Sequence, residues 1–373
     1  MDHDMTTVLK SSVAAAVSAV SESGSLTRFR EWIEPQLLGW LDRKAKESVG
    51  PAAEAAELTS RLREFVDRGG KRLRPALVFF AYRGCGGEDQ EAILPLAMST
   101  ELLHTYLLIH DDIMDGAAVR RGGPTAHRLF AADHRDQRWA GSSERHGESV
   151  AILLGDLAHS YAVELFLEAR SRFAARPLSD CFTAMCQEVV LGQYLEMTAP
   201  HRENPSKEEL LEVLRLKSGR YSVERPIALG AMAAGARDQV LERLTAYGEA
   251  LGEAFQLKDD LLGVFGVSDT VGKSVDSDIA EGKLTVLVQQ ALERSDDRGR
   301  TLLRATLGNR TANEDELRQA RAVVVASGAR AEVERMIESR LERAARALDR
   351  VELTSDAATF FVGLITFLRE REH

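Results

Sequence analysis

The stretch ELLHTYLLIHDDIMD (residues 101–115) is an apolar helix that ends in three carboxylates, and GEALGEAFQLKDDLLG (residues 248–263) repeats this layout with an acidic pair. Helical periodicity, carried mainly by Ala, Leu, Glu and Arg, continues on both sides of the two stretches. No proline follows Pro226, and alternating β-branched runs bounded by turns are nearly absent. The sequence therefore predicts an all-α protein of about a dozen helices.

The breaks between the predicted helices are short, and apolar helices resume on both sides of each break. Although 373 residues could form two ordinary domains, this continuity favours one large helical domain over residues 26–373. A flexible segment is expected over residues 1–25. The stretch at residues 133–147 is polar and aperiodic, so we expect a surface loop there.

The amino-acid composition indicates which classes of partner and which cellular compartment suit the protein. With 48 Lys and Arg against 58 Asp and Glu, the net charge is −10, which argues against a nucleic-acid partner. Three cysteines are too few and too irregular for a disulfide framework or a zinc site, which predicts buried thiols in a reducing compartment. The start of the chain is too short and polar to span a membrane, and no other segment approaches 18 apolar residues. We expect a soluble, cytoplasmic protein without an integral membrane segment.

The acidic cluster of Asp111, Asp112 and Asp115 predicts a metal site. Residues i and i+4 of a helix lie about 40° apart around its axis, so Asp111 and Asp115 project from one face. A solvated helix face is the alternative, but three clustered carboxylates repel one another unless cations bridge them. Oxygen ligands without His or Cys suit Mg²⁺, which also keeps water and phosphate oxygens in its shell. The cluster therefore suggests a Mg²⁺–diphosphate site.

Basic motifs flank this cluster in the sequence. Arg120 and Arg121 precede a Gly-Gly-Pro turn and offer two guanidinium groups for bidentate phosphate contacts. The stretch GGKRLRP (residues 69–75) combines a flexible turn, three cations and a helix start, which suits an anion. An ordinary basic turn, or a glycine helix cap with surface charges, would explain either motif alone.

Together the motifs resemble the trans-isoprenyl diphosphate synthase (polyprenyl synthetase) family. They occur in one order across roughly 215 residues. The resemblance implies an isoprenoid synthase-type fold, which is a helical bundle around a central cavity. It also implies a homodimeric, Mg²⁺-dependent transferase that joins isopentenyl diphosphate to an allylic diphosphate. The motifs are GGKRLRP (69–75), HDDIMDGAAVRRGGPTAH (110–127), GDL (155–157), GQ (192–193), KSG (217–219), FQLKDDLLG (255–263), GK (272–273) and GK (282–283).

The resemblance also implies residue roles. About three Mg²⁺ per active site are expected, held by the two Asp-rich motifs. The metal ligands would be Asp111, Asp112, Asp115, Asp259 and Asp260. The isopentenyl diphosphate pocket would be Lys71, Arg74, His104 and Arg121. The allylic substrate would be bound by Arg120, Lys217, Ser218, Lys273 and Lys283, with Gln256 near the reacting carbons. The residues expected to matter most for catalysis are Asp111, Asp112, Asp115, Arg120, Lys217, Gln256 and Asp259.

Two positions depart from the family pattern. Ser218 stands where Thr is usual and keeps the hydroxyl group. Gly263 replaces the usual third Asp of the second motif, so Asp259 is the position there that should matter most for metal. His110, beside Asp111, is expected to be structural.

Tyr106 and Leu107 bear on product length. In the family, enzymes that make C20 product typically have one aromatic residue five positions before the first Asp-rich motif and no second aromatic residue beside it. The pattern at Tyr106 and Leu107 is similar to this type. Leu107 is not aromatic and the motif has no two-residue insertion, which favours geranylgeranyl over farnesyl diphosphate (C15). The alternative is that Tyr106 is a core residue and another helix forms the cavity floor.

Other functions fit the sequence less well. A class I terpene cyclase would carry an Asn/Ser/Glu metal triad in place of the second Asp pair. A non-catalytic partner subunit of a synthase would be expected to lose an Asp-rich motif. An acidic helical scaffold would leave the ordered motifs unexplained.

Overall fold

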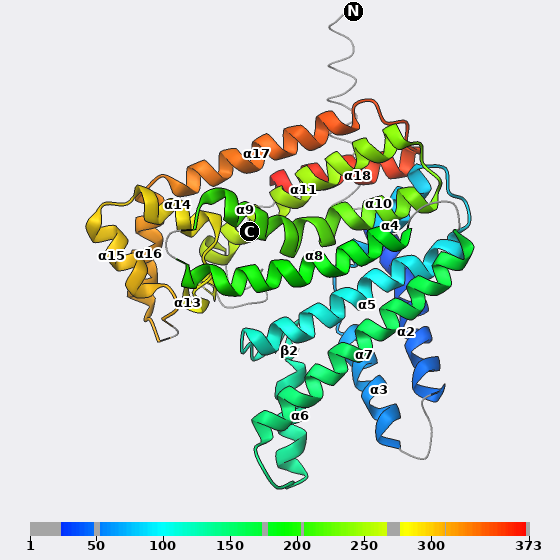
Figure 1. Cartoon of the computed structure of the whole chain (residues 1–373), viewed down its shortest axis with the longest axis horizontal. Coiled ribbons are helices and arrows are strands. Elements are labelled where there is room, and N and C mark those ends of the chain that lie inside the picture. The colour runs from blue at the N-terminus through cyan, green and yellow to red at the C-terminus, as the bar shows by residue number, and fades with distance from the viewer. Residues whose placement is uncertain are drawn as a thin grey trace, which may run out of the picture. The chain divides into compact units, whose positions relative to one another are not determined.

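The computed structural model describes residues 24–47, 53–173, 178–202, 205–266, 277–309 and 311–370. Secondary structure in these ranges is helical apart from one short hairpin, so the all-α prediction is confirmed (Figure 1). The helices group into two compact units, which we describe separately. The single domain over residues 26–373 stays a prediction.

The first unit comprises residues 24–79 and 88–173 and is built around α5. Asp89 caps the start of α5 by accepting a hydrogen bond from the Ala92 amide at 2.9 Å. The helix is buried on most sides, which explains its nearly continuous apolar sequence, and α7 lies along it (Figure 1). The elements of this unit are α2 (Ser25–Glu47), α3 (Ala53–Asp67), α4 (Leu73–Gly84) as far as Phe79, α5 (Gln90–Met114), β1 (Val119–Arg120), β2 (Gly123–Pro124), α6 (Ala126–Asp136) and α7 (Ser143–Arg172).

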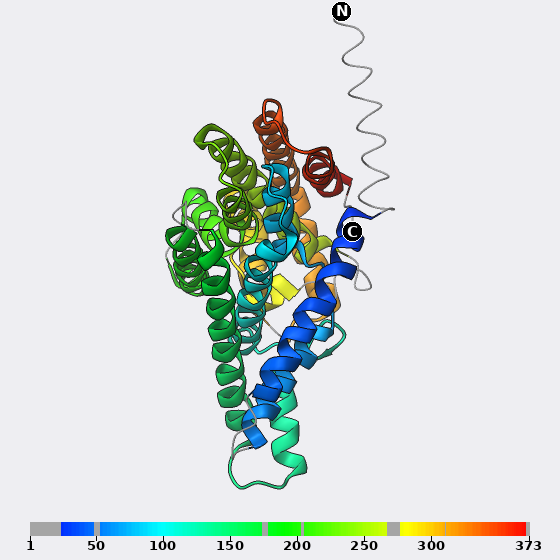
Figure 2. The ribbon, with the colours of Figure 1, turned by 90° about the vertical axis from the view of Figure 1, so that its right-hand side faces the viewer.

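The predicted surface loop at residues 133–147 is wrong in extent. Helix α6 continues to Asp136 and α7 begins at Ser143, which leaves only the loop at residues 137–142 between them (Figure 2). Ser142 caps α7 by accepting a hydrogen bond from the Arg145 amide at 3.2 Å. A Cβ on Gly147 would lie 2.2 Å from the carbonyl oxygen of His127, so the two helices are already in backbone contact there. The polar residues are helix ends and caps, which composition alone does not distinguish from a loop.

The second unit comprises residues 80–87 and the described residues from 178 onward. Helix α11 lies at its centre, with η2 and α17 packed along it. The Tyr247 hydroxyl on α11 donates to the carbonyl oxygen of Phe361 at 2.7 Å, and Phe80 stacks on Phe360. Its elements are the end of α4, α8 (Leu178–Thr198), η1 (Ala199–His201), α9 (Lys207–Leu214), the π-helix η2 (Arg215–Glu224), α10 (Arg225–Ala233), α11 (Asp238–Phe265), α13 (Ser277–Glu281), α14 (Val286–Arg294), α15 (Asp297–Thr306), α16 (Glu314–Ala326), α17 (Ala329–Leu348) and α18 (Ser355–Glu370).

Two of the described helices, α5 and α7, are long and apolar enough to cross a membrane by length and composition alone. In α5, 72% of the most apolar 18-residue stretch is buried inside the fold, and in α7 the corresponding share is 44%. The apolar residues of α5 therefore serve the core of the first unit, whereas α7 also presents apolar side chains on its surface.

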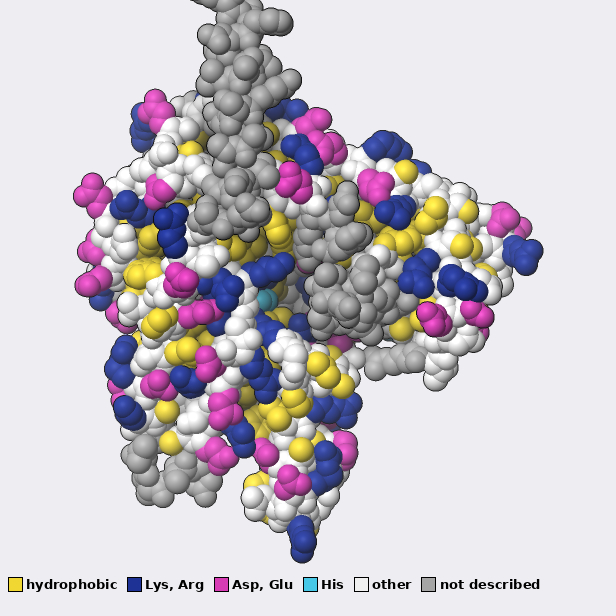
Figure 3. All heavy atoms as spheres, turned by 180° about the vertical axis from the view of Figure 1, so that it is seen from behind, with side chains coloured by type: hydrophobic (Ala, Val, Ile, Leu, Met, Phe, Trp, Pro, Cys, Tyr) yellow, Lys and Arg dark blue, Asp and Glu magenta, His cyan; other side chains and the backbone are white. Residues whose placement is uncertain are grey.

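The surface carries both signs of charge. On the face shown in Figure 3, Lys and Arg side chains are interspersed with Asp and Glu. The net charge of −10 is therefore not gathered into one acidic patch on that face.

Candidate active site

The C-terminal end of α5 brings the first acidic cluster together with Arg120. Asp112 is fully buried, and its Oδ1 accepts a hydrogen bond from Arg120 Nε at 2.5 Å. The same guanidinium lies 3.7 Å from Asp111 Oδ2. Asp115 caps the end of the helix. Two carboxylates of the first motif, Asp111 and Asp112, therefore lie against one guanidinium.

The short hairpin after α5 places Arg121. Arg121 and Gly122 form the two-residue turn between β1 and β2, and both have positive φ, 51° and 71°, as a type I′ hairpin turn requires. The Arg121 guanidinium lies 3.9 Å from Glu101 Oε1. A Cβ on Gly70 would lie 3.0 Å from a terminal nitrogen of the Arg121 guanidinium, so the glycine makes room for this arginine.

Arg72 turns inward and does not join the predicted anion site. Its side chain is buried, and it donates to Glu101 at 2.5 Å, to Glu34 at 3.3 Å and to the Val66 carbonyl oxygen at 2.7 Å. It also has a positive φ of 50°. Arg72 therefore anchors the junction between the loop that carries Lys71 and the start of α4, which carries Arg74.

His104 lies within this arginine-rich region. Burial lowers the pKa of His104 well below its usual value, and the positive charges of Arg74, Arg121, Arg120 and Arg72 lower it further. The imidazole is therefore neutral at physiological pH. Lys71 is exposed on the preceding loop. Arg74, His104, Arg120 and Arg121 thus lie within electrostatic reach of one another, as a pocket for an anion requires.

Tyr106 lies one turn before His110 on α5 and contacts α7. Its ring centre is 4.8 Å from that of His110 and 5.0 Å from that of His159. His110 shares a hydrogen bond with the carbonyl oxygen of Ile152 at 3.0 Å, in agreement with a structural role. Leu107 is partly buried beside Tyr106.

The second unit contains a small cavity of about 40 Å³ that five predicted site residues line. Gln256 and Asp260 are one turn apart on α11, and the Gln256 amide donates to Asp260 Oδ1 at 2.8 Å. The other predicted residues on its wall come from η2 and from the segment before α14; the five are Lys217, Ser218, Gln256, Asp260 and Lys283. Asp259 is the neighbour of Asp260 on α11 and does not line this cavity. Lys273 lies outside the described residues.

A glycine contact explains how η2 reaches this cavity. A Cβ on Gly192 would lie 2.3 Å from the Lys217 amide nitrogen, so only glycine lets α8 approach the π-helix this closely. Glu196, one turn further along α8, lines the same cavity and bonds the Lys217 ammonium. Sequence reasoning missed Glu196, although its spacing of four from Gly192 places it on the same helix face.

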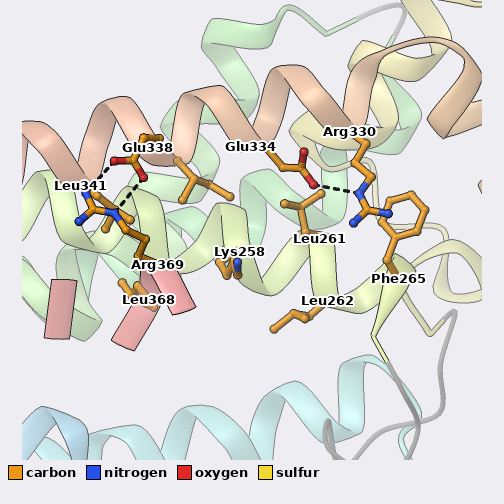
Figure 4. A pocket seen from close by; sticks show the side chains of 11 residues that line it. Lys258, Leu261, Leu262, Phe265, Arg330, Glu334, Glu338, Leu341, Leu368 and Arg369 are labelled. Atoms are coloured by element: carbon orange, nitrogen blue, oxygen red, sulfur yellow. Dashed lines mark hydrogen bonds and ion pairs between the residues drawn. The ribbon is translucent and has the colours of Figure 1, made fainter. Parts of the chain in front are cut away.

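A larger cavity of about 580 Å³ opens on another part of the second unit, between α11, α17 and α18 (Figure 4). Its floor is apolar, and its rim carries the ion pairs Arg330–Glu334 and Arg369–Glu338. None of the predicted site residues lines it. The larger of the two cavities is therefore not the one that the predicted site residues line.

The donor set fits Mg²⁺ better than a transition metal. The predicted ligands are all carboxylates, on α5 and α11. Among the described residues, no group of three His, Cys, Asp or Glu side chains is placed to hold a metal ion. Mg²⁺ commonly takes one or two protein carboxylates and completes its shell with substrate phosphates and water, so these carboxylates suit a metal that arrives with a diphosphate.

Comparison with known proteins agrees with this chemistry. A sequence model of the polyprenyl synthetase family matches residues 55–324. The chain is 35% identical to a short chain isoprenyl diphosphate synthase of Methanocaldococcus jannaschii over 68% of this chain and 71% of that protein. It is 34% identical to a geranylgeranyl diphosphate synthase of Saccharolobus solfataricus, with shares of 69% and 73%. A crystal structure of geranylgeranyl pyrophosphate synthase from Corynebacterium glutamicum, complexed with isoprenyl diphosphate and magnesium, superposes with a TM-score of 0.87 at 34% identity, covering 93% of this chain and all of that one. The predicted isoprenoid synthase-type fold is thereby confirmed.

Proposed function

Because the chain belongs to the polyprenyl synthetase family, we propose that it condenses isopentenyl diphosphate with an allylic diphosphate and makes mainly geranylgeranyl diphosphate. It is a transferase of the short-chain trans-prenyltransferase type. The observation that best supports the proposal is the small cavity in which four residues expected to contact the allylic substrate meet Asp260, a predicted metal ligand.

About three Mg²⁺ per active site would be held by Asp111, Asp112, Asp115, Asp259 and Asp260. When bound, these ions stabilise the negative charge that develops on the departing diphosphate. The protein would contribute cations to the same task, namely Arg120, Lys217 and Lys283, and the sequence adds Lys273. Preorganised charges of this kind act without reorganisation cost at the moment the allylic C–O bond breaks.

The first unit would bind the second substrate. Lys71, Arg74 and Arg121 supply positive charge for the diphosphate of isopentenyl diphosphate. His104, held neutral by burial and by these arginines, supplies a hydrogen-bonding group without adding to the charge. The double bond then attacks the allylic cation, and the proton that is lost passes to the departing diphosphate. No Ser-His-Asp or Cys-His arrangement is needed.

Product chromatography tests this proposal. The purified protein, given Mg²⁺ and isopentenyl diphosphate with dimethylallyl, geranyl or farnesyl diphosphate, should make C20 product from each primer. Product that stops at C15 would support the farnesyl diphosphate synthase alternative. Cyclic hydrocarbons would support a terpene cyclase, and an inactive chain would support a partner subunit.

Tyr106→Ala is expected to lengthen the product beyond C20. Removing the ring opens space beside His110 and His159, about 7.5 Å along the helix axis from Asp111. Chromatography of the products with farnesyl diphosphate as primer measures the change. Tyr106→Phe, which keeps the ring, should leave the C20 product in place. Unchanged product length in Tyr106→Ala would show that another helix forms the floor.

We also propose that the chain forms a homodimer. Helix α8 exposes Val190, Leu191, Tyr194 and Met197, which recur at helical spacing and are 49–64% exposed. Helix α7 separately exposes apolar residues, among them Leu153. An apolar helix stripe of this kind is typical of an interface between protein subunits.

Leu191→Glu is therefore expected to shift the protein from dimer to monomer, because the charge would be buried without a partner in the interface. Sedimentation velocity measures the mass. The control is Val325→Glu on α16, where Val325 is exposed to a similar extent and lies outside the stripe. A Leu191→Glu protein that stays dimeric would exclude α8 from the interface.

A cytoplasmic location also remains our proposal. Burial raises the pKa of Cys85 and Cys186 to about 11 and that of Cys181 to about 12. All three are free thiols. They are therefore protonated and poorly reactive at neutral pH, which suits a reducing compartment.

A further inference from the structure

The Lys217 ammonium, a predicted ligand of the allylic diphosphate, bonds a carboxylate of its own chain. Glu196 Oε2 accepts from Lys217 Nζ, and both residues line the small cavity of the second unit. Lys283 shows the same feature, since its ammonium lies 3.0 Å from Glu281 Oε2. Two cations on the cavity wall therefore already have an anionic partner.

The backbone holds this pair in place. Gly192 brings α8 against the amide of Lys217, and Glu196 follows one helical turn later on the same face. Lys217 is held in the π-helix η2, a geometry that often marks functional sites. The side chains of Glu196 and Lys217 are 29% and 18% exposed, so a ligand that enters the cavity can reach the pair.

From this geometry we propose that Glu196 is a positioning residue that competes with diphosphate for Lys217. In the absence of substrate it keeps the ammonium aimed into the cavity. When a diphosphate binds, Glu196 must share the ammonium with it or release it. The inference rests on the proposed function, because it assumes that the cavity receives a diphosphate group.

The consequence is that Glu196 weakens the affinity of the protein for the diphosphate that the reaction releases. The Glu196 carboxylate offsets the positive charge of the Lys217 ammonium that would otherwise attract the phosphates, and its loss should tighten diphosphate binding about tenfold at the effective dielectric constant of a partly buried site. Tighter binding of the released diphosphate would slow turnover wherever product release limits the rate. Glu196→Gln should therefore lower both kcat and the KM for the allylic substrate, while the KM for isopentenyl diphosphate stays unchanged.

A double-mutant cycle with inorganic diphosphate tests the inference. The dissociation constant is measured by calorimetry, with and without Mg²⁺, for the full-length wild type, Glu196→Gln, Lys217→Met and the double variant. Glu196→Gln should bind about tenfold more tightly than the wild type. The gain should vanish in the Lys217→Met background, because the carboxylate acts through the ammonium. Asp180→Asn, an exposed change on the same helix, should match the wild type.

The possible outcomes are distinct. Unchanged or weaker binding in Glu196→Gln would overturn the inference, and so would a gain that persists without Lys217. A wild type that does not bind diphosphate even with Mg²⁺ would contradict the proposed function and the inference with it. Because Gln matches Glu in shape, circular dichroism should show an intact fold, and Glu196→Ala provides a second variant with the same expected direction.

Discussion

Asp111→Ala is expected to lower kcat by about 10³-fold or more, because a carboxylate of the proposed Mg²⁺ site is lost at the position where the leaving charge develops. Asp112 is engaged with Arg120 and is fully buried, whereas the Asp111 side chain is 21% exposed and can reach a metal. Steady-state release of diphosphate from isopentenyl and farnesyl diphosphates measures the loss.

Asp136→Ala provides the control for this experiment. Asp136 is an exposed carboxylate at the end of α6 in the same unit. It should keep the wild-type rate. An Asp111→Ala protein with activity within a few-fold of the wild type would remove the first acidic cluster from the mechanism.

Glu101→Ala is expected to lower the free energy of unfolding by about 3–5 kcal/mol, because it leaves the buried Arg72 guanidinium without its main counter-ion. Both side chains are at most 2% exposed, and their bond is 2.5 Å long. Urea denaturation of the full chain, followed by circular dichroism, measures the change.

Glu34→Ala is the matched control, because Glu34 contacts the same guanidinium from a 28% exposed position at 3.3 Å. Its loss should cost about 1 kcal/mol or less. Equal, small effects of the two substitutions would show that the buried pair does not stabilise the first unit.

The sequence predicted the all-helical fold because the apolar helices are long and regular. It failed at residues 133–147, where polar caps and helix ends have the composition of a loop. Gln256 and Asp260 are four residues apart and hydrogen-bond on one helix face, as this spacing allows. That both share a cavity with Lys217 and Lys283 could not be derived from spacing, because the residues come from separate segments.

The carboxylates that pair with buried arginines were harder to predict from the sequence than the arginines of the basic motifs. Glu101 is the one charged residue between Glu91 and His110 in the core helix, and that isolation was an available signal of a buried ion pair. Arg72 looked like a surface cation of a basic turn, yet its positive φ directs it inward to Glu101. The partner of a buried charge depends on tertiary packing, which local sequence does not encode.

The most direct test of the proposed function is whether diphosphate release requires both substrates. The purified protein with Mg²⁺ should release one diphosphate for each isopentenyl unit incorporated, and none from farnesyl diphosphate alone. Chelation of Mg²⁺ should abolish the release. Diphosphate released from farnesyl diphosphate without isopentenyl diphosphate, or no release with both substrates present, would contradict it.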